Sequence, residues 1–288
     1  MQANRMSIAA NDGTSIPVAA YHIGDEPVRG IVIVSHGFGE HSGSYEQLAE
    51  CLHQEQYATV VLDQRGHGDL GEESLTIRRK RLGVIPGYQS FLDDIAAVTA
   101  ELKRRFPNTP LVLYGHSMGG NIAINCLLRH SQSAFACAVI ESPWLGLYKE
   151  FPPLIYGVAK VLGHLSPAIA IVNTLSPSDI TGDPVRAQEI AEDPLYHNRI
   201  SMRMFSGIKD GAAFALKNAA TLSVPTFVAS AKYDRIVSNE KIREFLSLCG
   251  SHVVSAEYES NHSIHNDRKK DDFHHDLLAF VNKHCIAL

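Results

Sequence analysis

Short apolar runs recur along the chain, and each is followed by a turn signal and then by a helix-like stretch. The runs are rich in β-branched residues and lack polar alternation, which is typical of strands covered on both faces. They predict buried strands at 30–36, 58–63, 111–114, 134–140, 225–230 and 252–258. Helical patterns lie between them, near 44–55, 87–106, 118–131, 238–248 and 271–284. This alternation predicts an α/β fold with a mostly parallel central sheet and helices on both faces.

Two regions depart from this rhythm. Residues 6–10 and 16–22 predict a hairpin across Asn11-Asp12-Gly13, and therefore an antiparallel pair at one edge of the sheet. Between Trp144 and Phe205, prolines and apolar helical pieces occur without obvious strands. We predict that 144–205 is a helical cap inserted over the carboxyl edge of the sheet, where open α/β sheets bind ligands. The core is then formed by 1–143 and 206–288.

One segment, 151–174, is apolar enough to raise the question of a membrane-spanning helix. Lys160 and Pro167 lie near its middle, and a spanning helix would have to bury that charge and that break at the bilayer centre. We therefore expect two short amphipathic helices separated near 164–167. The chain opens without an apolar run behind a basic stretch, so a secretory signal is not expected.

Composition narrows the class of protein. The chain has 288 residues, of which 45% are hydrophobic, and this is long enough for one large domain with an insertion. The formal net charge of -5 lacks the basic excess of a nucleic-acid binder. The five cysteines are widely spaced without a CxxC, which favours free, mostly buried thiols over a zinc site or a disulfide framework. We expect a cytoplasmic protein.

The most informative stretch is Gly115-His116-Ser117-Met118-Gly119, a G-x-S-x-G motif directly after a predicted strand and directly before a predicted helix. A nucleophile at the tip of such a turn has a strained backbone, and the flanking glycines relieve the crowding that a Cβ would cause. The hydroxyl of Ser117 then projects at the top of the sheet, beside the free N–H groups of a helix N-terminus. The alternative is that Ser117 only caps the helix.

The loop after the first buried strand, His36 to Gly43, is rich in glycine. An α/β-hydrolase takes its second oxyanion donor from the loop after this strand. We predict that the main-chain N–H groups of Phe38 and Met118 form the oxyanion hole; the alternative is an ordinary glycine turn. His36 and His41 are expected to make structural hydrogen bonds, because no metal-binding spacing such as HExxH is present.

A serine nucleophile needs a neutral imidazole, and the imidazole needs a carboxylate that fixes its tautomer. In this fold the order along the chain is serine, acid, histidine. Asp234 follows the strand at 225–230 and His262 follows the next strand, so both fall at the carboxyl edge with Ser117. His265 is the alternative base, and a turn paired with Arg235 is the alternative role of Asp234.

Taken together, these motifs resemble the monoacylglycerol lipase and lysophospholipase branch of the α/β-hydrolases, of the serine aminopeptidase S33 type. The resemblance covers nearly the whole chain in the expected order: 36–43, 63–68, 115–120, 233–237 and 261–262. It implies the α/β-hydrolase fold with a cap near 144–205. The chemistry predicted from the ordered triad needs no metal or cofactor. The resemblance also implies the triad Ser117, Asp234 and His262, with oxyanion donors from Phe38 and Met118.

Three positions depart from the family's pattern. Ser44 stands where arginine is usual, Asp69 where a serine usually follows Arg-Gly-His-Gly, and Ser263 where glutamate usually follows the catalytic histidine. None of these changes removes a reacting group. All three lie where substrate selection or loop geometry can change.

These residues predict a two-step acyl transfer on a carboxylic ester, and the resemblance favours a monoacylglycerol or a lysophospholipid. A short soluble ester is the alternative substrate, and a non-catalytic binding protein on a hydrolase scaffold is the alternative outside this class. The apolar stretches 151–156 and 168–172 either line an acyl tunnel, touch a lipid surface or only pack the cap onto the core. The basic cluster at 78–81 either meets anionic headgroups or is a solvated loop.

Overall fold

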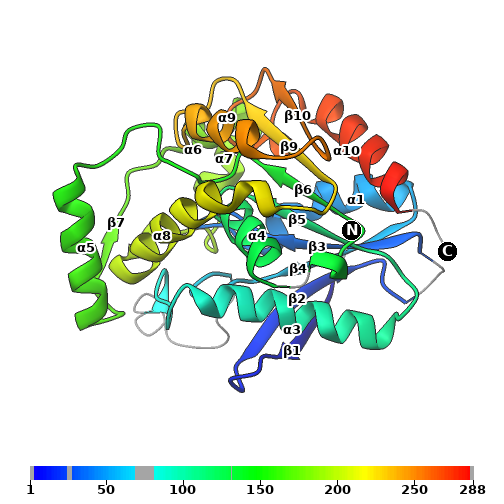
Figure 1. Cartoon of the computed structure of the whole chain (residues 1–288), viewed down its shortest axis with the longest axis horizontal. Helices are drawn as coiled ribbons and strands as arrows, with labels where there is room; N and C mark the ends of the chain where they lie inside the picture. Colours follow the sequence, from blue (N-terminus) through cyan, green and yellow to red (C-terminus); the bar gives the residue numbers. More distant parts are fainter. Residues whose placement is uncertain (1–2, 25–27, 69–80, 131, 286–288) are drawn as a thin grey trace.

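The core of the molecule is a mixed sheet of eight strands in the order β1-β2-β4-β3-β5-β6-β9-β10 (Figure 1). The computed structural model describes residues 3–24, 28–68, 81–130 and 132–285. The parallel part contains the six predicted strands: β3 (Gly30–Ser35), β4 (Tyr57–Leu62), β5 (Leu111–His116), β6 (Cys137–Glu141), β9 (Thr226–Ala231) and β10 (Val253–Tyr258). Burial is wrongly predicted for β10, which lies at the sheet edge with Val254, Ser255 and Glu257 exposed. The predicted hairpin, β1 (Asn4–Ala9) and β2 (Ser15–Tyr21), pairs antiparallel at one edge.

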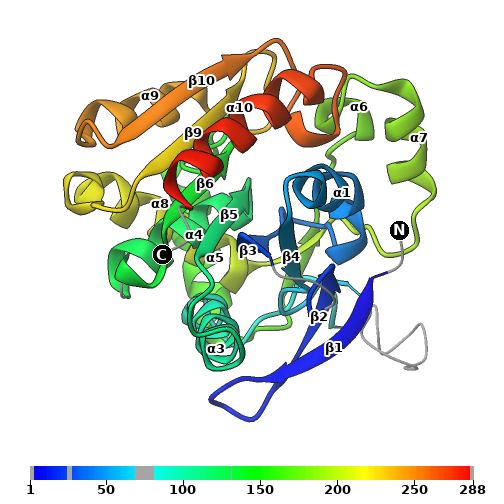
Figure 2. The ribbon, with the colours of Figure 1, turned by 90° about the vertical axis from the view of Figure 1, so that its right-hand side faces the viewer.

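Helices cover both faces of this sheet, as the alternation predicts (Figure 2). One face packs against α1 (Glu46–Gln54) and α10 (Lys270–His284), through Leu48, Leu52, Phe273 and Leu277. The other packs against α3 (Gln89–Arg105), α4 (Met118–Arg129), α8 (Met202–Asn218) and α9 (Asn239–Leu248). The sequence pattern does not predict α8, and the predicted cap, 144–205, includes the first turn of this helix.

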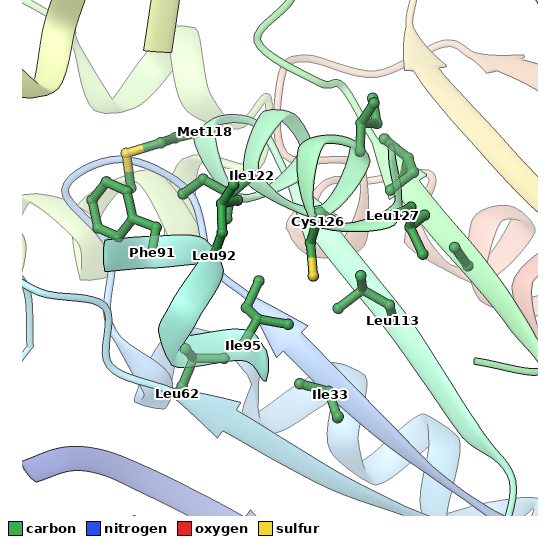
Figure 3. Close-up of a cluster of buried hydrophobic side chains, with 14 of the residues drawn as sticks. Ile33, Leu62, Phe91, Leu92, Ile95, Leu113, Met118, Ile122, Cys126 and Leu127 are labelled. Atoms are coloured by element: carbon green, nitrogen blue, oxygen red, sulfur yellow. The ribbon is translucent and has the colours of Figure 1, made fainter. Parts of the chain in front are cut away.

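The core between the sheet and helices α3 and α4 is closely packed (Figure 3). Apolar side chains of the two helices meet each other and the strands below, and each is at most 3% exposed. They include Phe91, Leu92, Ile95, Met118, Ile122, Cys126, Ile33 and Leu113. Because α4 begins directly after Ser117, this packing holds the start of the helix rigidly against the sheet.

The segment between β6 and α8, for which a cap is predicted and which is called the cap below, contains α5 (Pro153–Leu165), β7 (Ala170–Val172), α6 (Pro177–Ile180), α7 (Pro184–Glu192) and β8 (Arg199–Ser201). Of the two short helices expected within 151–174, the first is present as α5, but the second is wrong. Residues 170–172 instead form β7, which pairs antiparallel with β8. The two β-branched residues Ile171 and Val172 favour a strand. The partner strand β8 lies about thirty residues further along the chain, so the local periodicity of 168–174 does not reveal the pairing.

Two smaller expectations can be compared with the structure. All five cysteines are free thiols, and Cys126, Cys137 and Cys285 are buried. Within the described ranges, no helix combines the length and apolar character needed to cross a membrane.

Candidate active site

The predicted site residues meet at one edge of the sheet because β3, β5, β6, β9 and β10 all run parallel and end there. The loop after β3 carries Phe38, the turn after β5 carries Ser117, the turn after β9 carries Asp234, and the loop after β10 carries His262. This is the edge at which ligands bind in open α/β sheets.

Ser117 lies in the turn between β5 and α4 with φ 54° and ψ −116°, a conformation that is strained for a residue with a Cβ. The two glycines are required by close contact. A Cβ on Gly119 would lie 1.9 Å from the carbonyl oxygen of Ser35, and one on Gly115 would lie 2.5 Å from the carbonyl oxygen of Gly119. The Ser117 side chain makes no capping hydrogen bond, so the alternative of a plain helix cap is not supported.

The loop after β3 lies directly against the start of α4. A Cβ on Gly119 would be only 2.5 Å from the carbonyl oxygen of His36, two residues before Phe38. Within the described ranges, neither the main-chain N–H of Phe38 nor that of Met118 donates to a protein acceptor. Two unused donors are therefore present on the two segments where the oxyanion hole is predicted.

Asp234 and His262 form a buried pair. The Nδ1 atom of His262 donates to Oδ2 of Asp234 at 2.7 Å. The other carboxylate oxygen accepts the main-chain N–H groups of Ile236 and Val237 at 2.8 and 2.9 Å. The carboxylate is thus held in place by its own turn, and it keeps the imidazole proton on Nδ1, which leaves Nε2 as the basic nitrogen. Asp234 therefore pairs with the histidine and not with Arg235.

His262 lies beside the residue that precedes Ser117. The ring of His116, the residue before Ser117, is 4.9 Å from the ring of His262 between centroids. Among the described residues, no hydrogen bond joins the Ser117 hydroxyl to His262. Nucleophile–base contacts are often long in unliganded enzymes and shorten when substrate binds.

His265, the alternative base, is occupied elsewhere. Its side chain is fully buried, and Nδ1 lies 2.8 and 3.0 Å from the two carboxylate oxygens of Glu141, the last residue of β6. The hydroxyl of Tyr114 donates to the same carboxylate. His265 therefore belongs to a buried network behind the Asp234–His262 pair and not to the pair itself.

This network contains charges that the sequence reasoning missed. Nδ1 of His116 lies 3.4 Å from the carboxylate of Glu40. Burial alone would lower the pKa of His116, but the Glu40 and Glu141 carboxylates overcome that effect and raise the pKa to about 9. Burial would likewise raise the pKa of Glu141, but His265 and His116 lower it to about 2. The sequence holds one signal of this buried network, which is that Glu141 ends an otherwise apolar strand.

Three members of the network could in principle hold a metal ion. His116, Glu141 and His265 present ligand atoms within 4.8 Å of one another. The Glu141 carboxylate, however, already accepts hydrogen bonds from Tyr114 and His265. A metal ligand must also be unprotonated, and the raised pKa of His116 favours its protonated form. The residues fit a hydrogen-bonded ion network better than a metal site.

His36 and His41 make structural hydrogen bonds, which confirms their predicted role. His36 accepts the main-chain N–H of Gln64 on Nε2 at 3.0 Å. His41 accepts the N–H of Gly43 on Nδ1 at 3.1 Å and bonds Asp193 of the cap through Nε2 at 2.8 Å. His41 thereby ties the cap to the core.

Two of the three positions that depart from the family's pattern, Ser44 and Ser263, lie within the described residues. Ser44 is buried, and its carbonyl oxygen accepts hydrogen bonds from Arg186 of α7 at 3.4 Å and from Asn266 at 3.2 Å. A cap arginine therefore reaches the position where the family usually carries its own. The Ser263 hydroxyl lies 3.4 Å from Nε2 of His116. Asp69 and three residues of the basic cluster, 78–80, lie outside the described residues.

A serine at a strand–turn–helix elbow, followed along the chain by an acid and a histidine at the same sheet edge, is the arrangement of an α/β-hydrolase. Comparison with known proteins defines the family further. The chain belongs to the serine aminopeptidase S33 family, because the model of this family matches residues 26–269.

The chain is similar to proteins named as lipases and as a phospholipase. It is 27% identical to a monoacylglycerol lipase of Mycolicibacterium smegmatis over 214 residues, 74% of this chain and 73% of that one. It is 27% identical to phospholipase YtpA of Bacillus subtilis over 263 residues, 90% and 97% of the two chains. The crystal structure of Paleococcus ferrophilus monoacylglycerol lipase superimposes with a TM-score of 0.83 at 26% identity, covering 94% of this chain and 100% of that one. These comparisons support an ester hydrolase.

Proposed function

We propose that the protein is a serine hydrolase that cleaves carboxylic esters through an acyl-enzyme on Ser117. The observation that carries this proposal is the buried Asp234–His262 pair at the same sheet edge as a strained serine elbow. The names of the similar proteins, which are lipases and a phospholipase, support the same chemistry.

The proposed reaction follows from the positions of these groups. His262 takes the Ser117 proton on Nε2 as the oxygen attacks the ester carbonyl, and the N–H groups of Phe38 and Met118 bind the oxyanion. Each such donor typically contributes about 3–4 kcal/mol to the transition state. His262 then gives its proton to the leaving alcohol. Water repeats the sequence and releases the acid.

We propose a monoacylglycerol or a lysophospholipid as the substrate. Support comes from the similar proteins and from the apolar character of the cap beside the carboxyl edge. Each methylene buried in an acyl site stabilises the complex by about 0.8 kcal/mol, or roughly fourfold in rate constant. We therefore expect kcat/KM to rise steeply with acyl length across a panel from two to eighteen carbons.

The panel is measured with monoacylglycerols, lysophosphatidylcholines and nitrophenyl esters of the same acids. Preference for one headgroup at equal chain length distinguishes the two proposed substrate classes. A maximum at two to four carbons in every series would contradict the lipid substrate and favour a carboxylesterase for short soluble esters.

We further propose that the cap contacts a lipid surface through α5. Leu154, Val158, Val161 and Leu165 recur at helical spacing on one side of this helix. They face outward, with Leu154 77% and Leu165 75% exposed, while Ala159 is buried on the opposite side. The helix lies at the end of the molecule far from α10 (Figure 1). An exposed apolar stripe of this kind is typical of a helix that lies in a membrane interface.

The double substitution Leu154→Ser/Leu165→Ser is expected to weaken binding to phosphatidylcholine vesicles at least tenfold, because each buried leucine contributes about 1.5–3 kcal/mol. Co-flotation with vesicles measures the binding. Hydrolysis of a soluble ester should be unchanged. Leu248→Ser, which removes an exposed leucine from α9, is the matched control. Equal vesicle binding by all three proteins would refute a role of α5.

A further inference from the structure

Two buried polar side chains that do not react in the proposed mechanism lie on either side of one main-chain unit. His36 is 0% exposed and Glu40 is 3% exposed. Both contact Gly37, which directly precedes Phe38. Buried polar groups are costly unless their hydrogen bonds are satisfied, so the partners of these two side chains indicate what they hold in place.

The hydrogen bonds of His36 define its tautomer. Nε2 accepts the main-chain N–H of Gln64 at 3.0 Å, so the ring proton is on Nδ1. Nδ1 donates to the carbonyl oxygen of Gly37 at 2.7 Å. Burial lowers the pKa of His36, which keeps the ring neutral with one donor and one acceptor.

The carbonyl that His36 holds belongs to the same peptide group as the N–H of Phe38. The described chain contains no cis peptide bond. In a trans peptide group the N–H points opposite to the C=O. By fixing the direction of the Gly37 carbonyl, His36 therefore also fixes the direction of the Phe38 N–H.

Glu40 holds the other side of the same glycine. Its Oε2 atom accepts the Gly37 N–H at 2.8 Å and the Tyr45 hydroxyl at 2.6 Å. A Cβ at position 37 would lie 2.8 Å from Nδ1 of His116 and 3.0 Å from the Glu40 carboxyl group. Gly37 is thus held at both its N–H and its carbonyl oxygen, in a space that accepts no side chain.

We propose that His36, with Glu40, is a positioning residue that aims the Phe38 N–H at the oxyanion of the acyl-transfer transition state. This inference rests on the proposed function. A displacement of about 1 Å at a reacting centre can cost about a hundredfold in rate. Loss of the His36 donor should therefore lower transition-state binding and leave ground-state substrate binding nearly unchanged.

Two substitutions of similar size separate this role from simple packing. His36→Asn keeps an amide nitrogen one bond from Cγ, as Nδ1 is, and so retains a donor for the Gly37 carbonyl. His36→Gln places its amide one bond further out, near the position of Nε2, and loses that donor. Thermal melting of both variants reports any common loss of stability.

The first readouts are kcat and KM for a monoacylglycerol. The second is the Ki of a trifluoromethyl ketone that carries the same alkyl chain as this substrate. Its adduct with the serine places an oxyanion in the proposed oxyanion hole. For His36→Gln we expect kcat/KM to fall about 10- to 100-fold, KM to change less than about twofold, and Ki to rise by the same factor as kcat/KM falls. His36→Asn should remain within about threefold of the native enzyme in both quantities.

Equal losses in the two variants, or a loss in His36→Gln with an unchanged Ki, would show that His36 acts only through packing. Full activity of His36→Gln would likewise overturn the proposal. A native protein that hydrolyses no ester and does not bind the ketone would instead overturn the proposed function, and this inference with it.

Discussion

Replacing Ser117 with alanine is expected to lower kcat for ester hydrolysis about 10⁶-fold, the loss typical when a serine nucleophile is removed. In the proposed mechanism the hydroxyl oxygen forms the acyl-enzyme, so its removal abolishes the covalent step. Because the buried side chain makes no capping hydrogen bond, the fold should tolerate the change. Turnover of a monoacylglycerol and the thermal melting temperature together measure the effect.

Ser142 provides a matched control for this substitution. It follows β6 at the same sheet edge, has a positive φ of 42°, and is fully buried. Its hydroxyl has no hydrogen-bond partner in the described part of the chain, so alanine should be tolerated there as well. Ser142→Ala should retain turnover. Residual turnover by Ser117→Ala above about one thousandth of the native rate would contradict the assigned nucleophile.

Asp234→Asn is expected to lower kcat about 10⁴-fold while the folded structure persists. The carboxylate accepts the Nδ1 proton of His262, and an amide in its place would favour the opposite tautomer. The basic nitrogen would then face away from the nucleophile. Measurement of kcat across pH 6 to 9 with a soluble ester tests this loss without interference from vesicle binding.

A loss of stability could imitate that result, because Asp234 is buried. Asp94→Asn is the matched control, since Asp94 is a buried carboxylate of α3 that pairs with Arg65 at 2.6 and 2.8 Å. Asp94→Asn should destabilise the protein and leave kcat within about threefold of native, because Asp94 lies outside the proposed mechanism. Comparable kcat losses in both variants would assign the Asp234 effect to stability and not to the tautomer.

Most of the sheet could be predicted from the sequence because its strands are short apolar runs bounded by turn signals. The hairpin β1–β2 was equally clear from Asn11-Asp12-Gly13. The cap was harder, because β7 is only three residues long and is stabilised by a partner strand distant in sequence. Helix α8 was missed because its first turn continues the apolar pattern of the cap.

The candidate site likewise contains residues that the sequence predicts and contacts that only the fold reveals. Ser117, Asp234 and His262 were predicted because local motifs and strand order place them at one edge. The buried Glu40–His116 contact joins residues separated by 76 positions, and only the fold reveals it. The role of His36 was predicted only as structural hydrogen bonding. Its effect on Phe38 depends on which carbonyl the ring contacts, and a sequence pattern does not give this.

Covalent labelling tests the assigned nucleophile most directly. The native protein, Ser117→Ala and Ser142→Ala are each treated with a fluorophosphonate and digested, and the modified peptide is identified by mass spectrometry. We predict one adduct on Ser117, complete loss of ester hydrolysis in step with labelling, no adduct in Ser117→Ala and normal labelling of Ser142→Ala. An adduct on a different residue, or ester hydrolysis that survives full labelling of Ser117, would contradict the account.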